Sequence, residues 1–179
     1  MILLKAPIEM LKLTLEQIQQ YLQRSYTAAD GLWFMKVEEA LGFDAALDMD
    51  AKVWEVMPKI QARQLKAFAG ADRGLEALRQ CMTTKLALDG FRFETRNGQN
   101  AFDVQISDCP WHDKMVSAKR GHLSKIIGER ICTAEYSIWA REFGCVFRFA
   151  SEKKICGGKD ECLLRFEDHS GVRRSQGSP

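Results

Sequence analysis

The sequence lacks the long apolar run that a membrane helix requires. Its hydrophobic stretches are far shorter than about 20 residues, and the first residues, Met1-Ile2-Leu3-Leu4-Lys5, lack the charged, apolar and small-residue segments of a secretory signal. A basic stripe is also absent, because 26 Lys and Arg are scattered among 24 Asp and Glu, giving a formal net charge of +2. These absences predict a cytoplasmic protein with no membrane and no nucleic-acid partner.

No repeat of solenoid length and no linker rich in Pro, Gly or Ser divides the 179 residues. The composition, with 46% hydrophobic and 28% charged residues, is that of an ordinary globular protein. We therefore expect a helical N-terminal region at 1–89 and a cysteine-bearing α+β region at 90–170 that share one core. A disordered tail is expected at 171–179.

Apolar residues recur at helical spacing through the first half of the chain. Thr14, followed three residues later by a Gln, has the pattern of a capping box. The helix that it begins continues, or restarts in mid-course, as far as Leu41. A second helical segment over about 44–69 contains Pro58, which removes one backbone donor and predicts a kink. A further helix is expected over about 72–88.

The period of the apolar pattern changes from helical to alternating after residue 90. Alternating runs are expected to form strands at 91–95, 102–106, 146–149 and 163–166. Asn97-Gly98 lies between the first two runs and is a strong hairpin signal. Two helices, over about 113–127 and about 133–143, are separated by Gly128. Hairpin, helix, helix and hairpin predict an α+β fold, in which a small antiparallel sheet of about four strands carries the helices on one face and the N-terminal helical segment packs beside it.

Six cysteines are present, and five of them fall in the second half, at positions 109, 132, 145, 156 and 162. Disulfide frameworks are typical of small domains in oxidising compartments, so we predict free thiols in this longer chain. Cys81, in a helical segment, and Cys145 are expected to be small buried hydrophobes. The other four cysteines are the candidates for chemistry.

Cys109-Pro110-Trp111-His112 places a thiol and an imidazole three residues apart, where a strand gives way to a helix. This spacing suits two ligands of a soft or borderline metal, or a thiol whose pKa is lowered by a neighbouring His⁺ or a helix N-terminus. The alternative is a core cysteine beside an exposed His112.

Cys132 and Glu135 are expected near the start of the next helix, where the helix dipole favours the charged forms of both. Together with Cys109 and His112 they have the number and type of groups that bind Zn²⁺ or Fe. The same set suits a thiol nucleophile with an adjacent general acid or base. In the alternative, Cys132 packs in the core and Glu135 only caps the helix.

Cys156 and Cys162 lie at the two ends of the loop in the second hairpin. With five residues between them, the two thiols suit a metal clip or a reversible disulfide. Simple packing is the alternative for a cysteine pair of this kind.

Acidic and aromatic residues share helix faces in the first half. They are Asp30, Trp33, Phe34, Val37 and Glu38 on one helix, and Asp50, Val53, Trp54 and Met57 on the next. Carboxylates on an apolar face tend to have a raised pKa or to bind a cation. The alternative is a set of surface acids beside an ordinary Trp stripe. The residues expected to contact a bound ligand or cofactor are Trp33, Glu38, Trp54 and Trp111.

Several segments resemble those of a prokaryotic family labelled L-2-amino-thiazoline-4-carboxylic acid hydrolase-like. In the first half they are Asp30-Gly31-Leu32-Trp33-Phe34, Val37-Glu38-Glu39, Gly42-Phe43 and Val53-Trp54-Glu55. In the second half they are Cys109-Pro110-Trp111, Cys132-Thr133-Ala134-Glu135-Tyr136 and Trp139-Ala140-Arg141-Glu142-Phe143-Gly144. The ending, at 158–166, is similar to the last strand of thiazoline hydrolases and of vinyl reductase (V-type sensor) domains. The resemblance covers about residues 14–167 and implies a shared fold.

The resemblance also implies a hydrolase of a cyclic amidine or amide, such as L-2-amino-thiazoline-4-carboxylate. In that reading Cys109 or Cys132 is a nucleophile or metal ligand, and His112 is the acid or base, while Glu135 orients them. The alternative is an accessory or sensor module without catalysis, in which the thiols hold a divalent metal (Zn, Mn or Fe), an Fe–S cluster or a small ligand. The candidate metal ligands are Cys109, His112, Cys132, Cys156 and Cys162. The expected partner is a small-molecule ligand or substrate, and a homo-oligomer is an open alternative.

Overall fold

The computed structural model describes residues 10–168. Its helices are α1 (Leu15–Leu41), α2 (Phe43–Trp54), α3 (Met57–Ala69), α4 (Leu75–Asp89), α5 (Pro110–Ser117) and α6 (Ser124–Glu142), with short 3₁₀ turns η1 (Gly121–Leu123) and η2 (Ile155–Gly157). Its strands are β1 (Arg92–Asn97), β2 (Ala101–Asp108), β3 (Cys145–Phe149) and β4 (Cys162–Asp168). The tail predicted at 171–179 lies outside the described residues.

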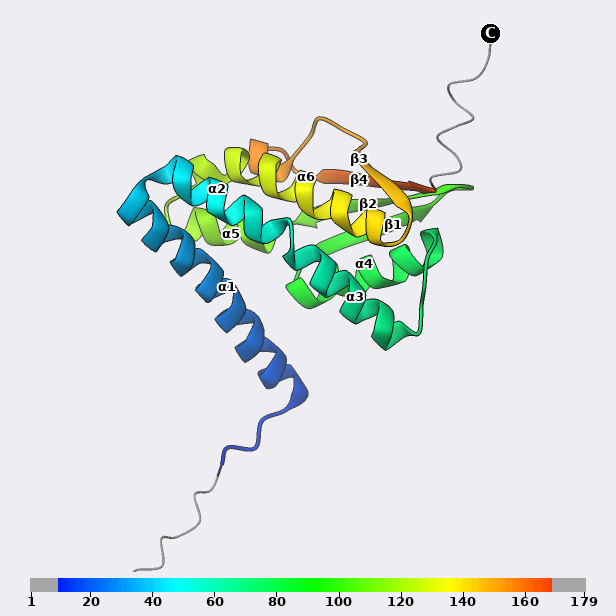
Figure 1. Cartoon of the computed structure of the whole chain (residues 1–179), viewed down its shortest axis with the longest axis horizontal. Coiled ribbons are helices and arrows are strands. Elements are labelled where there is room, and N and C mark those ends of the chain that lie inside the picture. The colour runs from blue at the N-terminus through cyan, green and yellow to red at the C-terminus, as the bar shows by residue number, and fades with distance from the viewer. Residues whose placement is uncertain (1–9, 169–179) are drawn as a thin grey trace, which may run out of the picture.

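Helix α1 is a single long helix with a complete capping box. The Gln17 N–H donates to the Thr14 hydroxyl at 3.2 Å, and the Thr14 N–H donates to the Gln17 side chain at 2.9 Å. The helix ends at Gly42, whose φ of 89° a residue with a side chain rarely adopts. Of the two alternatives, the helix that begins after Thr14 continues without a break to Leu41. Figure 1 shows α1 running away from the body of the protein toward its N-terminus.

The segment predicted as one kinked helix over 44–69 is instead two helices, so that prediction was wrong. A turn through Glu55 and Val56 separates α2 from α3, and Pro58 lies in the first turn of α3. A proline in the middle of a helix would remove a hydrogen bond and clash with the preceding turn, whereas the first turn has neither cost.

The boundary predicted at Gly128 was also wrong. The break lies between α5 and α6, around η1, where Lys119 has a positive φ of 59°. Gly128 lies inside α6, and a Cβ there would come within 3.1 Å of the Cys156 sulfur. The glycine thus permits a close approach of another segment and does not end the helix. Cys132 consequently lies in the middle of α6 and not at its N-terminus.

The four strands form one antiparallel sheet in the order β1-β2-β4-β3. Each predicted hairpin forms, and β2 pairs with β4, with Val104 opposite Leu164, to join the two hairpins. The helices gather on one face of this sheet (Figure 1). The structure therefore confirms the α+β fold with an N-terminal helical segment.

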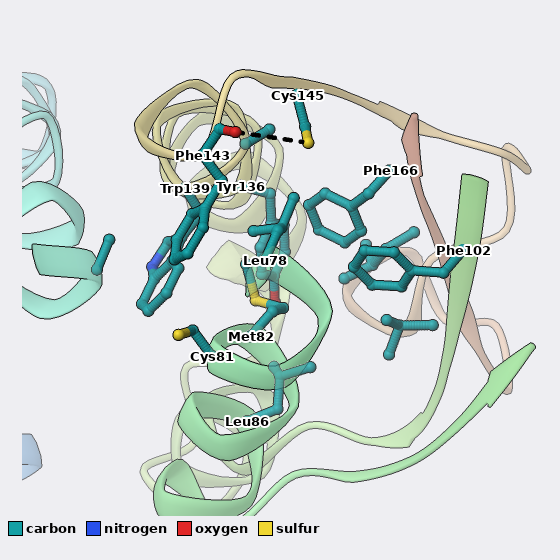
Figure 2. Close-up of a cluster of buried hydrophobic side chains, with 14 of the residues drawn as sticks. Leu78, Cys81, Met82, Leu86, Phe102, Tyr136, Trp139, Phe143, Cys145 and Phe166 are labelled. Atoms are coloured by element: carbon teal, nitrogen blue, oxygen red, sulfur yellow. Dashed lines mark hydrogen bonds between the residues drawn. The ribbon is translucent and has the colours of Figure 1, made fainter. Parts of the chain in front are cut away.

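The core lies between that face of the sheet and helices α3, α4 and α6 (Figure 2). Phe102 and Phe166, on the two central strands, stack with their ring centroids 4.9 Å apart. Leu78 and Met82 of α4, from the first half of the chain, and Trp139 of α6 are fully buried in the same cluster. The two halves therefore contribute to one core.

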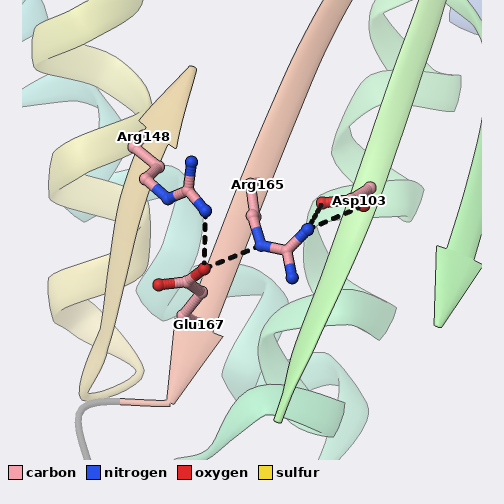
Figure 3. Close-up of polar contacts among 4 residues, drawn as sticks. All are labelled: Asp103, Arg148, Arg165 and Glu167. Carbon is pink, nitrogen blue, oxygen red and sulfur yellow. Dashed lines mark hydrogen bonds and ion pairs between the residues drawn. The ribbon is translucent and has the colours of Figure 1, made fainter. Parts of the chain in front are cut away.

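Ion pairs cover the opposite face of the sheet (Figure 3). Arg165 donates from Nε to Glu167 at 2.7 Å and pairs with Asp103 at 3.2 Å, while Arg148 pairs with Glu167 at 3.1 Å. This alternation of apolar and charged residues is typical of an antiparallel sheet with one solvated face. Within residues 10–168, none of the helices has the length and apolar character needed to cross a membrane.

Phe166→Ala should destabilise the protein by about 3–5 kcal/mol, because it removes a fully buried ring and leaves a cavity. Phe68→Ala, the same substitution at a residue that is 75% exposed, should change stability by no more than about 0.5 kcal/mol. Urea unfolding followed by circular dichroism measures both. Equal losses in the two variants would contradict the assignment of the core.

Candidate ligand-binding site

A cavity of about 330 Å³ lies between the helices and one end of the sheet. Its walls come from α1, α2, α5, α6, β2, the start of β4 and the segment around η2. Most of the lining is apolar, including Phe34, Met35, Phe91, Ile106, Met115, Ile127 and Ile131. A volume of this order is at the lower end of the roughly 300–1,000 Å³ that small-molecule sites occupy.

Four thiols that the sequence marked as candidates line this cavity, namely Cys109, Cys132, Cys156 and Cys162. Cys156 and Cys132 approach each other across Gly128, because their sulfurs lie 3.1 Å and 4.0 Å from the position of a Cβ on that glycine. Together these four residues form what we name the thiol wall. All six cysteines are free, and Cys81 and Cys145 are buried in the core as predicted.

The thiols of this wall do not have lowered pKa values, so that prediction was wrong. Burial raises the pKa of Cys109 to about 11, against hydrogen bonds from the backbone of His112 and Trp111. Burial also raises the pKa of Cys132 well above its usual value, and Glu135 adds to the effect. Since the thiolate is the reactive form, these cysteines are poor nucleophiles near neutral pH in this arrangement.

His112 lines the cavity beside the thiol wall. Its Nδ1 shares a hydrogen bond of 2.8 Å with the hydroxyl of Ser124, the first residue of α6, which is fully buried. This bond fixes the orientation of the imidazole. The structure therefore does not support the alternative of an exposed histidine beside a core cysteine.

Glu135 lines the cavity but forms an ion pair with Lys85 of α4, a residue that the sequence analysis missed. Lys85 Nζ also lies 3.0 Å from Asp89 Oδ2, and its side chain is only 4% exposed. Burial alone would lower the pKa of Lys85, but these two carboxylates outweigh burial and raise it. Lys85 therefore stays charged, and Glu135 serves as its counter-ion, with no role as a helix cap.

Two carboxylates form another part of the wall, Asp30 from α1 and Asp50 from α2. Burial raises the pKa of Asp30, and burial followed by repulsion from Asp30 raises the pKa of Asp50 to about 7. Hydrogen bonding from the Trp54 side chain opposes both shifts. These shifts confirm the expectation for acids on an apolar, Trp-bearing face. We name Asp30, Asp50 and Trp54 the acidic end.

Of the four residues predicted to contact a ligand, Trp54 and Trp111 line the cavity. Their rings meet edge to face with centroids 5.8 Å apart. Trp33 points away from the cavity into an outer groove beside α2 and is 66% exposed. Glu38 forms an ion pair with Arg120 at 2.6 Å and does not line the cavity, although Arg120 does. The sequence predicted that Asp30 and Trp33 share one face of α1. In the structure Asp30 lines the cavity, whereas Trp33 lines the outer groove.

The predicted metal ligands do not form a metal site as they are arranged. Within the part of the chain that the structure describes, no group of three or more His, Cys, Asp or Glu residues could hold a metal ion. Backbone support for one sulfur is present, because the Ile155 N–H donates to Cys162 Sγ at 3.3 Å. A divalent metal or an Fe–S cluster on the thiol wall stays a prediction.

Asp50→Asn should stabilise the protein at pH 8 by about 1–2 kcal/mol, after allowing for screening by solvent. A carboxyl whose pKa is raised on folding contributes stability below its unfolded pKa, near 4, and this contribution is lost as the pH rises through about 7. The gain over the original protein should therefore shrink from pH 8 to pH 5. Urea unfolding at both pH values measures it. Glu55→Gln, at an exposed residue after α2, is the control, and parallel profiles for Asp50→Asn and the original protein would contradict this account.

Comparison with known proteins identifies the family of this chain. A search of curated proteins finds no significant match. Residues 9–156, most of the chain, match a family of unknown function (DUF6125). That match covers the acidic end, Cys109, Cys132 and Cys156, and ends before β4. The chain belongs to this family.

Proposed function

We propose that the chain binds a small molecule with a largely apolar body and one basic nitrogen group, such as an amidine. The observation that carries the proposal is the acidic end of the cavity, where Asp30 and Asp50 are half-buried in an apolar wall and have raised pKa values. Two carboxylates that repel each other in such a place are costly in the empty protein. A cation bound between them offsets that cost.

No lysine or arginine within residues 10–168 forms an ion pair with Asp30 or Asp50. The positive charge is thus left for a ligand to supply. A protonated amidine presents parallel N–H donors that match a carboxylate bidentately, and the rings of Trp54 and Trp111 suit its flat cationic face. The apolar remainder of the cavity accommodates the rest of the molecule.

Benzamidine and benzamide test this proposal, because they have the same shape and differ in charge. By isothermal titration calorimetry at pH 8, benzamidine should bind at least about tenfold more tightly than benzamide, which corresponds to about 1.4 kcal/mol. Asp50→Asn should remove most of that preference, and lowering the pH to 5 should weaken benzamidine binding because Asp50 becomes protonated.

Glu55→Gln is the control and should bind both probes as the original protein does. Equal binding of the two probes, or a preference that survives in both Asp50→Asn and Asp30→Asn, would overturn the proposal.

Hydrolysis of a cyclic amidine is the second candidate function. It is favoured by His112, which lines the same cavity as the acidic end with its ring held by Ser124. In this reaction His112 takes a proton from water as the water oxygen adds to the amidine carbon. The ring C–N bond then breaks, and its nitrogen takes the proton from His112 to become an amine that stays attached to the ring-opened product. Water is the nucleophile here, because the pKa of Cys109 is too high for attack at neutral pH.

The resemblance to L-2-amino-thiazoline-4-carboxylic acid hydrolase-like proteins supports the same class of substrate. Such a substrate carries a carboxylate as well as an amidine. Lys114 also lines the cavity, so a cation is available for the carboxylate while the acidic end holds the amidine, whereas Arg120 is already paired with Glu38. The six free thiols suit a reducing compartment such as the cytoplasm.

Incubation with 2-aminothiazoline-4-carboxylate, with and without Mn²⁺ or Zn²⁺, tests the hydrolase proposal by NMR detection of the ring-opened product. Turnover should fall by about 10²–10⁴-fold in His112→Gln, the usual range for loss of a general base. Cys109→Ser and Cys132→Ser should retain it. Absence of turnover under all conditions would contradict hydrolysis of this substrate and leave the binding proposal to its own test. Loss of turnover in Cys109→Ser with a retained fold would replace water by the thiol as nucleophile.

A further inference from the structure

Helix α1 carries a row of apolar side chains, most of which the described part of the chain leaves exposed. None of its residues is buried, and Leu15, Tyr21 and Trp33 are 85%, 67% and 66% exposed. Figure 1 shows its N-terminal end standing clear of the rest of the protein. A helical segment with so few tertiary contacts is marginal in water, because packing supplies most of the stability of helices. The exposure of this row therefore calls for a partner.

The row has a spacing that suits pairing with itself. Leu15, Ile18 and Leu22 lie on one face before the middle of the helix, and Ala29, Trp33 and Val37 continue that face after the middle. Residues 15 and 37, 18 and 33, and 22 and 29 lie at nearly equal distances on either side of residue 26. Two copies of α1 that run antiparallel would therefore place each apolar residue opposite another. An interface of this kind is self-complementary and closed by a two-fold axis.

A second pair of exposed residues, on one flank of the row, is also spaced nearly equally on either side of residue 26. Tyr21 and Leu32 both lie on that flank, are exposed, and flank the middle of the helix at similar distances. In an antiparallel pair related by a two-fold axis, equivalent flanks of the two helices face each other. Tyr21 of one copy would then pack against Leu32 of the other.

The area available matches what a stable dimer needs. Six side chains in this surface are exposed by 40–85%, namely Leu15, Ile18, Tyr21, Leu22, Leu32 and Trp33. Together they present roughly 800 Å², which is the area that each partner buries in a standard interface. Exposed apolar surface of this extent on a soluble protein marks an interaction site.

A groove on the same protein suits the N-terminal end of α1, where the row begins. It is lined by Trp33, Val37, Leu41, Met49, Lys52, Val53 and Val56, from α1 and α2. In the antiparallel arrangement, Leu15 of one copy lies at the level of Val37 of the other, beside this groove. The apolar end of α1, where Leu15 is 85% exposed, would thus pack in the groove of the second copy.

We infer that the chain forms a two-fold symmetric dimer in which the α1 helices pair antiparallel around residue 26 and the N-terminal end of each lies against the α1–α2 groove of the other. The occupant of the exposed face is a second copy of the same chain. Because Asp30 and Phe34 line the ligand cavity from the same helix, the dimer also holds one wall of that cavity in place. The dimer does not require the ligand.

Sedimentation equilibrium of the full chain tests this inference. The original protein should dimerise, and Ile18→Glu should raise the dimer dissociation constant by at least about tenfold, because it places a charge in the apolar row opposite Trp33 of the other copy. Gln17→Glu is the matched control: it adds the same charge on the opposite side of α1, and a glutamate there preserves the capping box. It should change the constant by less than about twofold. Circular dichroism establishes that each variant is folded.

The register is tested separately by oxidative cross-linking. Ser25 is exposed beside the proposed axis, so Ser25→Cys should form a disulfide between two copies. Glu39 is exposed but far from the axis, so Glu39→Cys should not form a disulfide between two copies. An original protein that is monomeric at every concentration, or one that is monomeric and binds phosphatidylcholine vesicles, would overturn the inference. So would dimers that Ile18→Glu leaves unchanged, or that cross-link equally well through position 39.

Discussion

The antiparallel pairing of β2 with β4 is the constraint on which both the core and the cavity depend. Because Ile106 lies opposite Cys162 in this register, the end of β2 and the start of β4 are at the same end of the sheet. Cys109, which follows β2, is thereby brought close to Cys162, although the two are distant in the sequence. A shift of this register by one residue would exchange the buried face, with Phe102 and Phe166, for the charged face. The thiol wall and the core therefore depend on the same set of strand contacts.

A buried ion pair then fixes the N-terminal helical region against this unit. Lys85 on α4 meets Glu135 on α6 in a place where both side chains are almost inaccessible to water. The ammonium group also lies over the rings of Phe91 and Tyr136, at 5.5 Å and 5.8 Å from their centroids. Removing Lys85 would leave the charge of Glu135 buried and uncompensated, which costs far more than breaking a surface pair. The pair thus specifies how α4 and α6 pack, and with them the wall that Glu135 contributes to the cavity.

The sequence correctly predicted those helices and strands that are determined by residues close together in the chain. Asn97-Gly98 between alternating runs gave the first hairpin correctly, and the capping box at Thr14 gave the start of α1. Gly128 was misjudged because its reason is not local: Cys156, from a later segment, packs against it within a helix. Because α6 continues through Gly128, Cys132 lies in the middle of a helix and not at its N-terminus. The predicted charged thiolate of Cys132 was therefore also wrong.

The candidate site shows the same division between local and long-range causes. The pattern of acids and tryptophans on two helices predicted raised pKa values, and Asp50 has one, because both helices turn that part of their faces toward a shared cavity. Trp33 lies close to Asp30 in sequence yet faces outward, since α1 is covered on one side only. Lys85 carried a detectable signal: it occupies the apolar face that Leu78 and Met82 define at helical spacing, with Asp89 one turn later. A charge in that position of a core helix requires a buried partner, although the sequence does not identify Glu135 as that partner.

The two polar regions of the cavity differ in what they require from a ligand. A thiol with a raised pKa, such as Cys109, remains neutral near pH 7 and can be buried at little cost. A carboxyl with a pKa of about 7, such as Asp50, is partly ionised at the same pH, and Asp30 beside it opposes that ionisation. The charge of Lys85 is already matched by Glu135 and Asp89, so it does not compensate the acidic end. The unfavourable charge in the cavity is therefore negative and located at the acidic end, and this is the physical reason for proposing a cationic ligand rather than one that reacts with the thiols.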